Sequence, residues 1–117
     1  MFSPSDFACR CDRGVKCDAA SISGELVSDL TLLRIEVGRP FFVTSGVRCL
    51  YWNSKEGGSD TSQHLIGNAV DFKVLDGSFL YQVVKHAPSF GFFGIGIAKG
   101  FVHLDRRKSK TPIIFGY

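Results

Sequence analysis

The sequence predicts an α+β fold in which helices pack against a small antiparallel central sheet. Two observations favour this class. Segments with the apolar spacing of helices alternate with short strand-like runs, and residues 1–117 are enough for one domain with a modest core but too few for two. Hydrophobic residues make up 44% and charged residues 21% of the chain, which excludes disordered and fibrous proteins.

The first predicted elements are a helix and a strand. From Ser23 to Val37 the apolar residues recur at spacings of four, three and four, which places them on one helical face: Leu26, Leu30, Leu33 and Val37. Ser23 can cap this helix, and Gly38 can end it. The run FFVT at 41–44 follows Pro40 and predicts a short buried strand.

A long irregular segment and a second strand come next. Residues 45–60 are rich in glycine and small polar residues, which predicts a loop with one helical turn around 51–55. A loop of this length in a small domain is unusual unless it builds a site. Residues 68–74 alternate as a strand, so Asp71 points away from the apolar face of Val70, Phe72 and Val74.

The remaining elements are a second helix and a hairpin. Residues 77–87 have helical apolar spacing and precede Pro88, and we expect His86 to lie exposed on the polar face of this helix. Residues 93–98 and 101–105 are strand-like runs joined by Lys99 and Gly100, a pair suited to a tight turn. His103 and Asp105 project from the same face of the second run.

Charge and hydropathy argue against nucleic-acid and membrane partners. The net charge of +3 depends on one short basic run, at Arg106, Arg107, Lys108 and Lys110. This run lacks the interleaved aromatic residues typical of nucleic-acid binders, and we expect a solvated face. No stretch approaches the ~18 apolar residues of a membrane span, and the start of the chain lacks the layout of a signal peptide.

The four cysteines leave three alternatives open. Cys9, Cys11 and Cys17 cluster near the start of the chain, and Cys49 stands apart. An even number permits two disulfides, a structural metal site or four free thiols. The spacing C-x-C-x5-C is not a familiar zinc-finger pattern.

Three polar residues are candidate ligands for one zinc ion. Hydrolytic zinc sites take three protein ligands from His, Asp or Glu and leave one position open for water. His64 and Asp71 lie seven residues apart, and His103 lies on another predicted strand. Spacing alone leaves open that these three residues are unrelated.

Four motifs, in order, resemble the M15 metallopeptidases, the D-alanyl-D-alanine carboxypeptidase group. SQHLIGNAVD, residues 62–71, resembles the motif S-x-H-x-x-G-x-A-x-D, and GRPFFVTSGVRC resembles G-x-P-x-x-x-x-S-G-x-R. FSPSDFACRC resembles the start of short phage and bacterial members, and GFVHLDRR resembles the closing H-x-D segment. The resemblance implies a fold similar to that of the Hedgehog domain and the DD-peptidases.

The resemblance also implies roles for individual residues. His64, Asp71 and His103 are expected to bind one Zn²⁺ ion. Arg48 is expected to act in catalysis and to bind a substrate carboxylate or the carbonyl oxygen on which charge develops, which suits its planar, permanently charged guanidinium. The supporting residues that would hydrogen-bond ligands or substrate are Ser45 and Ser62.

The position of the general base differs from the pattern of the family. Well-studied members carry an acid or a histidine two or three residues before the last ligand, where this chain has Gly100 and Phe101. Asp105 is the expected substitute, either as the general base or as a partner that orients the ring of His103. Glu56 and Asp60 are further candidates for the base.

The resemblance predicts a zinc-dependent peptidase that cuts peptidoglycan stem peptides, either as a D,D-carboxypeptidase or as an endopeptidase between L-Ala and D-Glu. We expect a monomeric phage lysin or virion-associated wall hydrolase, made in the host cytoplasm and released to the periplasm or cell wall. The alternative is a zinc-containing module that binds the wall with little or no turnover. A nucleic-acid binder is the least favoured reading of the sequence.

Overall fold

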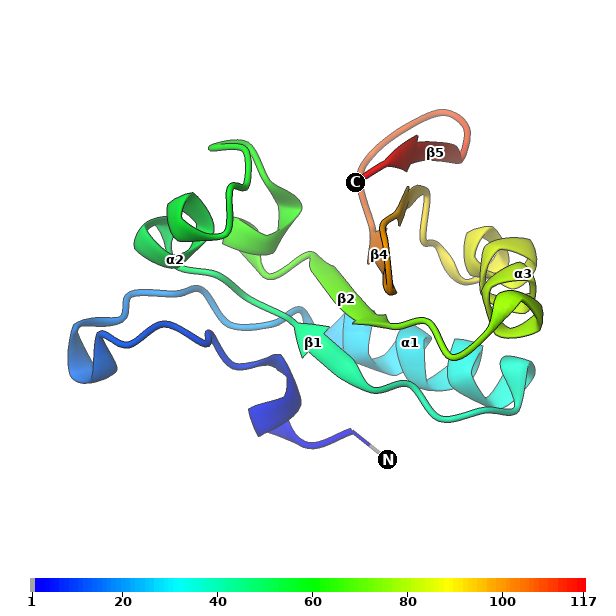
Figure 1. Ribbon diagram of the computed structural model, residues 1–117, viewed down its shortest axis with the longest axis horizontal. Helices are drawn as coiled ribbons and strands as arrows, with labels where there is room; N and C mark the ends of the chain where they lie inside the picture. The colour runs from blue at the N-terminus through cyan, green and yellow to red at the C-terminus, as the bar shows by residue number, and fades with distance from the viewer. Residues whose placement is uncertain (1) are drawn as a thin grey trace.

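The computed structural model, which describes residues 2–117, is built around a five-stranded sheet (Figure 1). The strands are β1 (Val43–Ser45), β2 (Ala69–Lys73), β3 (Gly94–Ile97), β4 (Phe101–Asp105) and β5 (Ile113–Gly116). The helices are α1 (Gly24–Val37), α2 (Leu50–Lys55) and α3 (Gly77–His86), and short 3-10 helices lie at Pro4–Phe7, Gly14–Lys16, Gln63–Ile66 and Ala87–Phe90. This arrangement confirms the α+β class.

The sheet is mixed, whereas the sequence had indicated an antiparallel one. Its strand order is β1-β2-β4-β3-β5, and only the β3–β5 pair is parallel. β5 was not predicted as a strand. Because β3 and β4 are antiparallel, β4 ends where β3 begins, with Gly94 opposite Asp105. The short connection 106–112 stays at that end, so β5 starts beside Gly94 and runs parallel to β3.

The core lies between one face of the sheet and two helices. The predicted first helix is confirmed: the Ser23 hydroxyl accepts a hydrogen bond from the Leu26 amide (3.3 Å), and Gly38 ends the helix with a positive φ of 75°. Core side chains come from both helices and from β2, β3 and β4: Leu26, Leu30, Leu33, Phe79, Val83, Val70, Phe72, Ile95, Val102 and Leu104. The alternate residues of β2 and β4 therefore face the opposite side of the sheet.

α3 packs beside α1, and this contact changes the expectation for His86. The Asp76 carboxylate caps α3 by accepting a hydrogen bond from the Phe79 amide (2.8 Å). The His86 ring lies 3.7 Å from the Glu36 carboxylate of α1, and its side chain is 23% exposed. The prediction of an exposed histidine was therefore wrong, because it ignored the neighbouring helix.

β1 begins two residues later than the predicted strand 41–44. Phe41 turns into the core, where its ring stacks on Phe72 at 4.3 Å between centroids. Backbone pairing with β2 then runs from Val43 to Ser45 with an irregularity between them. α2 corresponds to the helical turn expected around 51–55, and in Figure 1 it lies at the end of the molecule away from α3.

The basic run near the end of the chain is partly engaged in internal contacts. Arg106 pairs with Asp29 and donates to the Phe90 carbonyl (3.0 Å), and Arg107 pairs with Asp105 (2.6 Å). Half of the run therefore binds the protein's own carboxylates. Among residues 2–117, no helix is long and apolar enough to cross a lipid bilayer.

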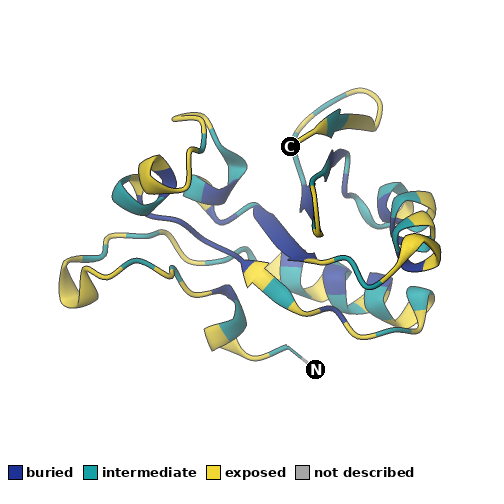
Figure 2. Cartoon of the chain, in the orientation of Figure 1, coloured by how far each residue is buried: buried dark blue, intermediate teal, exposed yellow. Residues whose placement is uncertain are grey.

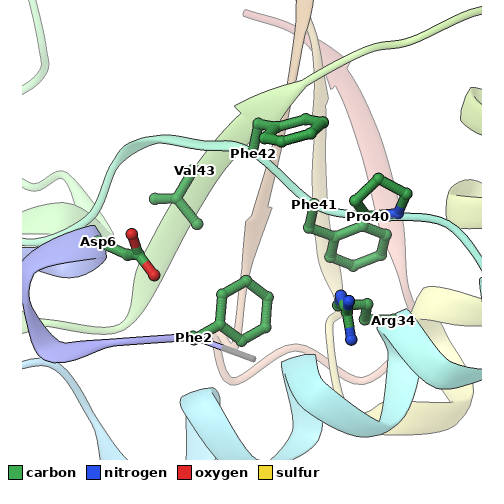
Figure 3. Close-up of a pocket in the computed structure, with 7 residues that line it drawn as sticks. All are labelled: Phe2, Asp6, Arg34, Pro40, Phe41, Phe42 and Val43. Atoms are coloured by element: carbon green, nitrogen blue, oxygen red, sulfur yellow. The ribbon is translucent and has the colours of Figure 1, made fainter.

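A hollow of about 330 Å³ separates the N-terminal segment from α1 and β1 (Figure 3). Its only charged lining residues are Asp6 and Arg34, and aromatic rings form much of its wall, as the close-up of Phe2, Phe41 and Phe42 shows. The lining contains neither histidine nor cysteine. The candidate zinc ligands lie on the other face of the sheet.

Candidate metal centre and active site

The three predicted zinc ligands meet in one buried cluster. His64, Asp71 and His103 each offer a ligand atom, and these atoms lie within 4.8 Å of one another. His64 Nε2 lies 3.1 Å from Asp71 Oδ1, His103 Nδ1 lies 2.9 Å from the same oxygen, and the two ring nitrogens are 3.2 Å apart. Their side chains are at most 4% exposed.

Strand register and a 3-10 helix position these side chains. Asp71 of β2 lies directly opposite His103 of β4 in the antiparallel ladder, so both project from the same face of the sheet. His64 lies in the 3-10 helix Gln63–Ile66, where the Ser62 hydroxyl accepts a hydrogen bond from the His64 amide (3.2 Å). Gly67 ends this helix with a φ of 72°, which favours glycine.

The spacing of the donor atoms is close to that of a tetrahedral zinc site. Zinc binds His nitrogen and carboxylate oxygen at about 2.0–2.2 Å, which places tetrahedral ligand atoms about 3.3–3.6 Å apart. The measured separations of 2.9, 3.1 and 3.2 Å lie just below this range. A small outward movement of the side chains would open the site to the size of the ion.

The far side of each ring is already hydrogen-bonded. His64 Nδ1 lies 2.6 Å from the Gly46 carbonyl, and His103 Nε2 lies 2.7 Å from Asp105 Oδ2. The near nitrogens, His64 Nε2 and His103 Nδ1, are therefore the ones directed at Asp71 Oδ1. This arrangement selects one coordinating nitrogen on each ring.

The charges of the cluster favour a positive charge at His103 beside an ionised Asp71. Burial would raise the pKa of Asp71, but hydrogen bonds from His103 and His64 hold it below its ordinary value. Burial would lower the pKa of His103, but the carboxylates of Asp105 and Asp71 raise it. The ring of His103 therefore favours a proton, and a metal ion bound at Nδ1 would compete for that position.

Asp105 is fully buried and both of its oxygens are engaged. Oδ2 accepts from Arg107 Nη2 (2.6 Å) and lies 2.7 Å from His103 Nε2, while Oδ1 accepts from the Arg107 amide and Nε (3.1 and 2.8 Å). Burial would raise the pKa of Asp105, but Arg107 and His103 hold it well below its usual range. The carboxylate is thus an ionised partner of His103, with no oxygen free of a protein contact.

Arg48 is buried behind Asp71. Its Nη2 lies 3.2 Å from Asp71 Oδ2, and its Nε donates to the Ser45 hydroxyl (3.1 Å). Asn53 Oδ1 accepts a third hydrogen bond from Arg48 Nη1 (3.3 Å). Arg48 therefore holds a candidate metal ligand in place and is itself held by Ser45, while the substrate-binding role expected for both residues stays a prediction.

Tyr117 is a site residue that sequence reasoning missed. Its hydroxyl lies 3.1 Å from His64 Nε2 and 3.5 Å from Asp71 Oδ2, and its ring packs against His103 with centroids 4.4 Å apart. Burial is the largest factor that raises its pKa, to about 12, so the hydroxyl is protonated at neutral pH. The run IIF before it, bounded by Pro112 and Gly116, was the signal for the strand that delivers it.

Two cavities border the cluster. One, of about 470 Å³, has His103 and Asp105 in its wall together with Ser62, Arg107, Phe115 and Tyr117. The other, of about 530 Å³, has Asp71, Arg48 and Ser45 in its wall together with Glu56, Lys73 and Lys99. Of the two further candidates for the general base, Glu56 borders the second cavity, whereas Asp60 lines neither.

Comparison with known proteins agrees with this geometry. The family model Peptidase M15 matches residues 1–105, which include the three candidate ligands and Asp105 but exclude Tyr117. A search of curated proteins finds no match to the chain. The family match covers most of the sequence, and its residues form a buried site suited to a metallopeptidase. The chain therefore belongs to the M15 family of peptidases.

Proposed function

We propose that this protein is a zinc-dependent peptidase that cuts the stem peptides of peptidoglycan. The observation that carries the proposal is the convergence of His64 Nε2, Asp71 Oδ1 and His103 Nδ1 in a chain of the M15 family. Three ligands are the number that leaves a hydrolytic zinc site one open position. The adjoining cavity of about 470 Å³ has room for part of a short peptide.

Zinc held there would lower the pKa of a bound water towards ~7 and polarise the scissile carbonyl. The protein's own groups complete the site. Asp105 holds the His103 ring in the tautomer that directs Nδ1 towards Asp71, and Arg48 holds the second oxygen of Asp71. The protonated Tyr117 hydroxyl would donate a hydrogen bond to the oxygen on which negative charge develops.

The assignment to wall peptides is supported by charge at the second cavity. Lys73 and Lys99 line it beside Arg48, so it offers cations to the free carboxylates of a stem peptide. A terminal carboxylate bound there would favour D,D-carboxypeptidase action, and an internal one would favour cleavage between L-Ala and D-Glu. The resemblance to short phage members supports a lysin or virion-associated role within this proposal.

The test is mass spectrometry of fragments released from purified sacculi. We expect wild-type protein to release peptides, a chelator to stop the release, and added zinc to restore it. His64→Ala should lose activity, whereas His86→Ala should retain it because His86 lies against Glu36 on the far helices. The mass of each released fragment locates the bond that is cut. Wild-type protein that binds zinc but releases nothing from several wall chemotypes would refute the enzymatic proposal.

A zinc-containing module that binds the wall without cutting it is the second candidate. It is favoured by one observation: the ionised Asp105 already contacts Arg107 and His103 through both oxygens, so it is poorly placed to take a proton from water. This candidate predicts that the protein sediments with sacculi at neutral pH and leaves their muropeptide profile unchanged.

A further inference from the structure

All four cysteines of the chain come together in a second cluster, separate from the three candidate ligands described above. The sulfur atoms of Cys9, Cys11, Cys17 and Cys49 lie within 4.8 Å of one another. The first three come from the N-terminal segment, and Cys49 is the residue that precedes α2. The sequence left disulfides, free thiols and a metal site as alternatives. The distances between the sulfur atoms help to distinguish them.

The separation of the Cys9 and Cys49 sulfurs matches a tetrahedral thiolate site, and the other sulfur pairs lie within 4.8 Å. Cys9 Sγ lies 3.7 Å from Cys49 Sγ. Zinc binds thiolate at about 2.3 Å, so two sulfurs of a tetrahedral site lie about 3.8 Å apart. Two disulfides would draw the sulfurs into bonded pairs about 2.05 Å apart. Instead, the four thiols are free and gathered around one point.

Backbone amides are directed at two of the sulfurs. The Cys49 amide donates to Cys9 Sγ (3.3 Å), and the Trp52 amide donates to Cys49 Sγ (3.4 Å). Hydrogen bonds of this kind stabilise the negative charge of a thiolate, which is the form that binds metal. These contacts also connect the N-terminal segment to α2.

The segment that carries three of the cysteines has almost no apolar core of its own. None of the residues from 8 to 22, all of which the structure describes, is buried, and its one short 3-10 helix includes the fully exposed Val15. Figure 2 shows this stretch in exposed and intermediate colours, in contrast to the buried strand β2. A segment with so little burial needs another source of order, and small protein units commonly take it from a metal.

We propose that Cys9, Cys11, Cys17 and Cys49 bind a second zinc ion with a structural role. Four thiolates fill the coordination sphere, as in structural sites and unlike the open site at His64. The ion would fix the N-terminal segment to the residues just before α2. That region includes Val47, whose amide donates to the Phe7 carbonyl (2.9 Å), and Arg48, which holds Asp71.

The proposal is independent of peptidase activity and is tested by metal content. Protein purified without oxygen or chelators should contain two zinc ions per chain by mass spectrometry of the metal. His64→Ala should retain one ion, and X-ray absorption should show it bound to sulfur alone at about 2.3 Å. A Cys11→Ser, Cys17→Ser variant should retain one ion with nitrogen and oxygen neighbours, and Lys16→Ala in the same segment should retain both.

Other results would overturn the proposal. A wild-type mass four hydrogens below that of the reduced chain would show two disulfides. Folded His64→Ala protein that lacks zinc, with four thiols that react at once with an alkylating agent, would show free cysteines. Because the His64→Ala protein already lacks the proposed active site, its sulfur-bound zinc can be measured whether or not the wild type cleaves peptides. If the double cysteine variant fails to fold, the zinc content of His64→Ala still decides whether the four cysteines bind zinc.

Discussion

Replacement of Asp105 by Asn separates its two possible roles. The change keeps the shape of the side chain and leaves an oxygen that can accept from His103 Nε2, but it removes the negative charge. A charge-assisted hydrogen bond contributes about 1.5–3 kcal/mol and is roughly twice as strong as a neutral one. The buried 2.7 Å contact between Asp105 and His103 belongs at the strong end of that range. Because a neutral hydrogen bond keeps about half of this contribution, Asp105→Asn should lose about 1.4 kcal/mol of zinc-binding free energy.

A loss of this size corresponds to zinc binding about tenfold weaker at the His64 site, which agrees with the lower end of effects measured for partners of metal-binding histidines. Competition with a chromophoric chelator measures the zinc affinity, best in the Cys11→Ser, Cys17→Ser background, where we expect only this site. At saturating zinc, Asp105→Asn should retain most of the wild-type kcat.

The matched control is Arg107→Gln, which leaves the Asp105 carboxylate and its contact with His103 in place. Arg107 is 31% exposed, so solvent screens its effect, and we expect zinc affinity to change about threefold or less. The orienting role would be refuted if Asp105→Asn bound zinc as tightly as the wild type while kcat fell by about 10²–10⁴, the contribution of a general base.

Three further changes test the packing and charge of the structure. Gly46→Ala should destabilise the fold by about 2–3 kcal/mol in urea unfolding, because a Cβ there would lie 2.4 Å from the Phe7 carbonyl, whereas Gly24→Ala meets nothing within 4 Å and should be neutral or stabilising. Tyr117→Phe should reduce kcat/KM by about 10² with zinc content unchanged; an unchanged kcat/KM would exclude it as a donor to the reacting oxygen. Asp76→Ala should destabilise the fold at neutral pH through the lost helix cap. Because Arg39 holds the folded-state pKa of Asp76 below its ordinary value, this difference should persist above pH ~4 and vanish as the pH falls through the folded pKa.

Local patterns were sufficient to predict most elements that carry the site. Alternation placed Asp71, and separately His103 with Asp105, on the polar faces of two strands, and both strands are present. The turn at Lys99 and Gly100 indicated the β3–β4 hairpin, which the structure confirms. These features depend on neighbouring residues, which is why the sequence alone was enough.

The features that local sequence patterns did not predict depend on contacts between distant segments. No turn joins β2 to β4, so nothing in the local pattern sets Asp71 opposite His103. Cys49 meets Cys9 across 40 residues, and Tyr117 reaches His64 across 53. The same lack of tertiary information explains the wrong exposure of His86, whereas β5 was missed although its local signal was present in the sequence.

The two strands that carry Asp71 and His103 contribute little to the outer wall of the adjoining cavity. That wall comes largely from the segment 58–63 and from Phe115 and Tyr117, which lie outside β2 and β4. Substitutions in this wall, Tyr117 excepted, can therefore alter which peptide fits while the buried candidate ligands and the core residues behind them stay the same. We expect related M15 peptidases to acquire new substrate preferences by change in these two segments, with strands β2 and β4 kept constant.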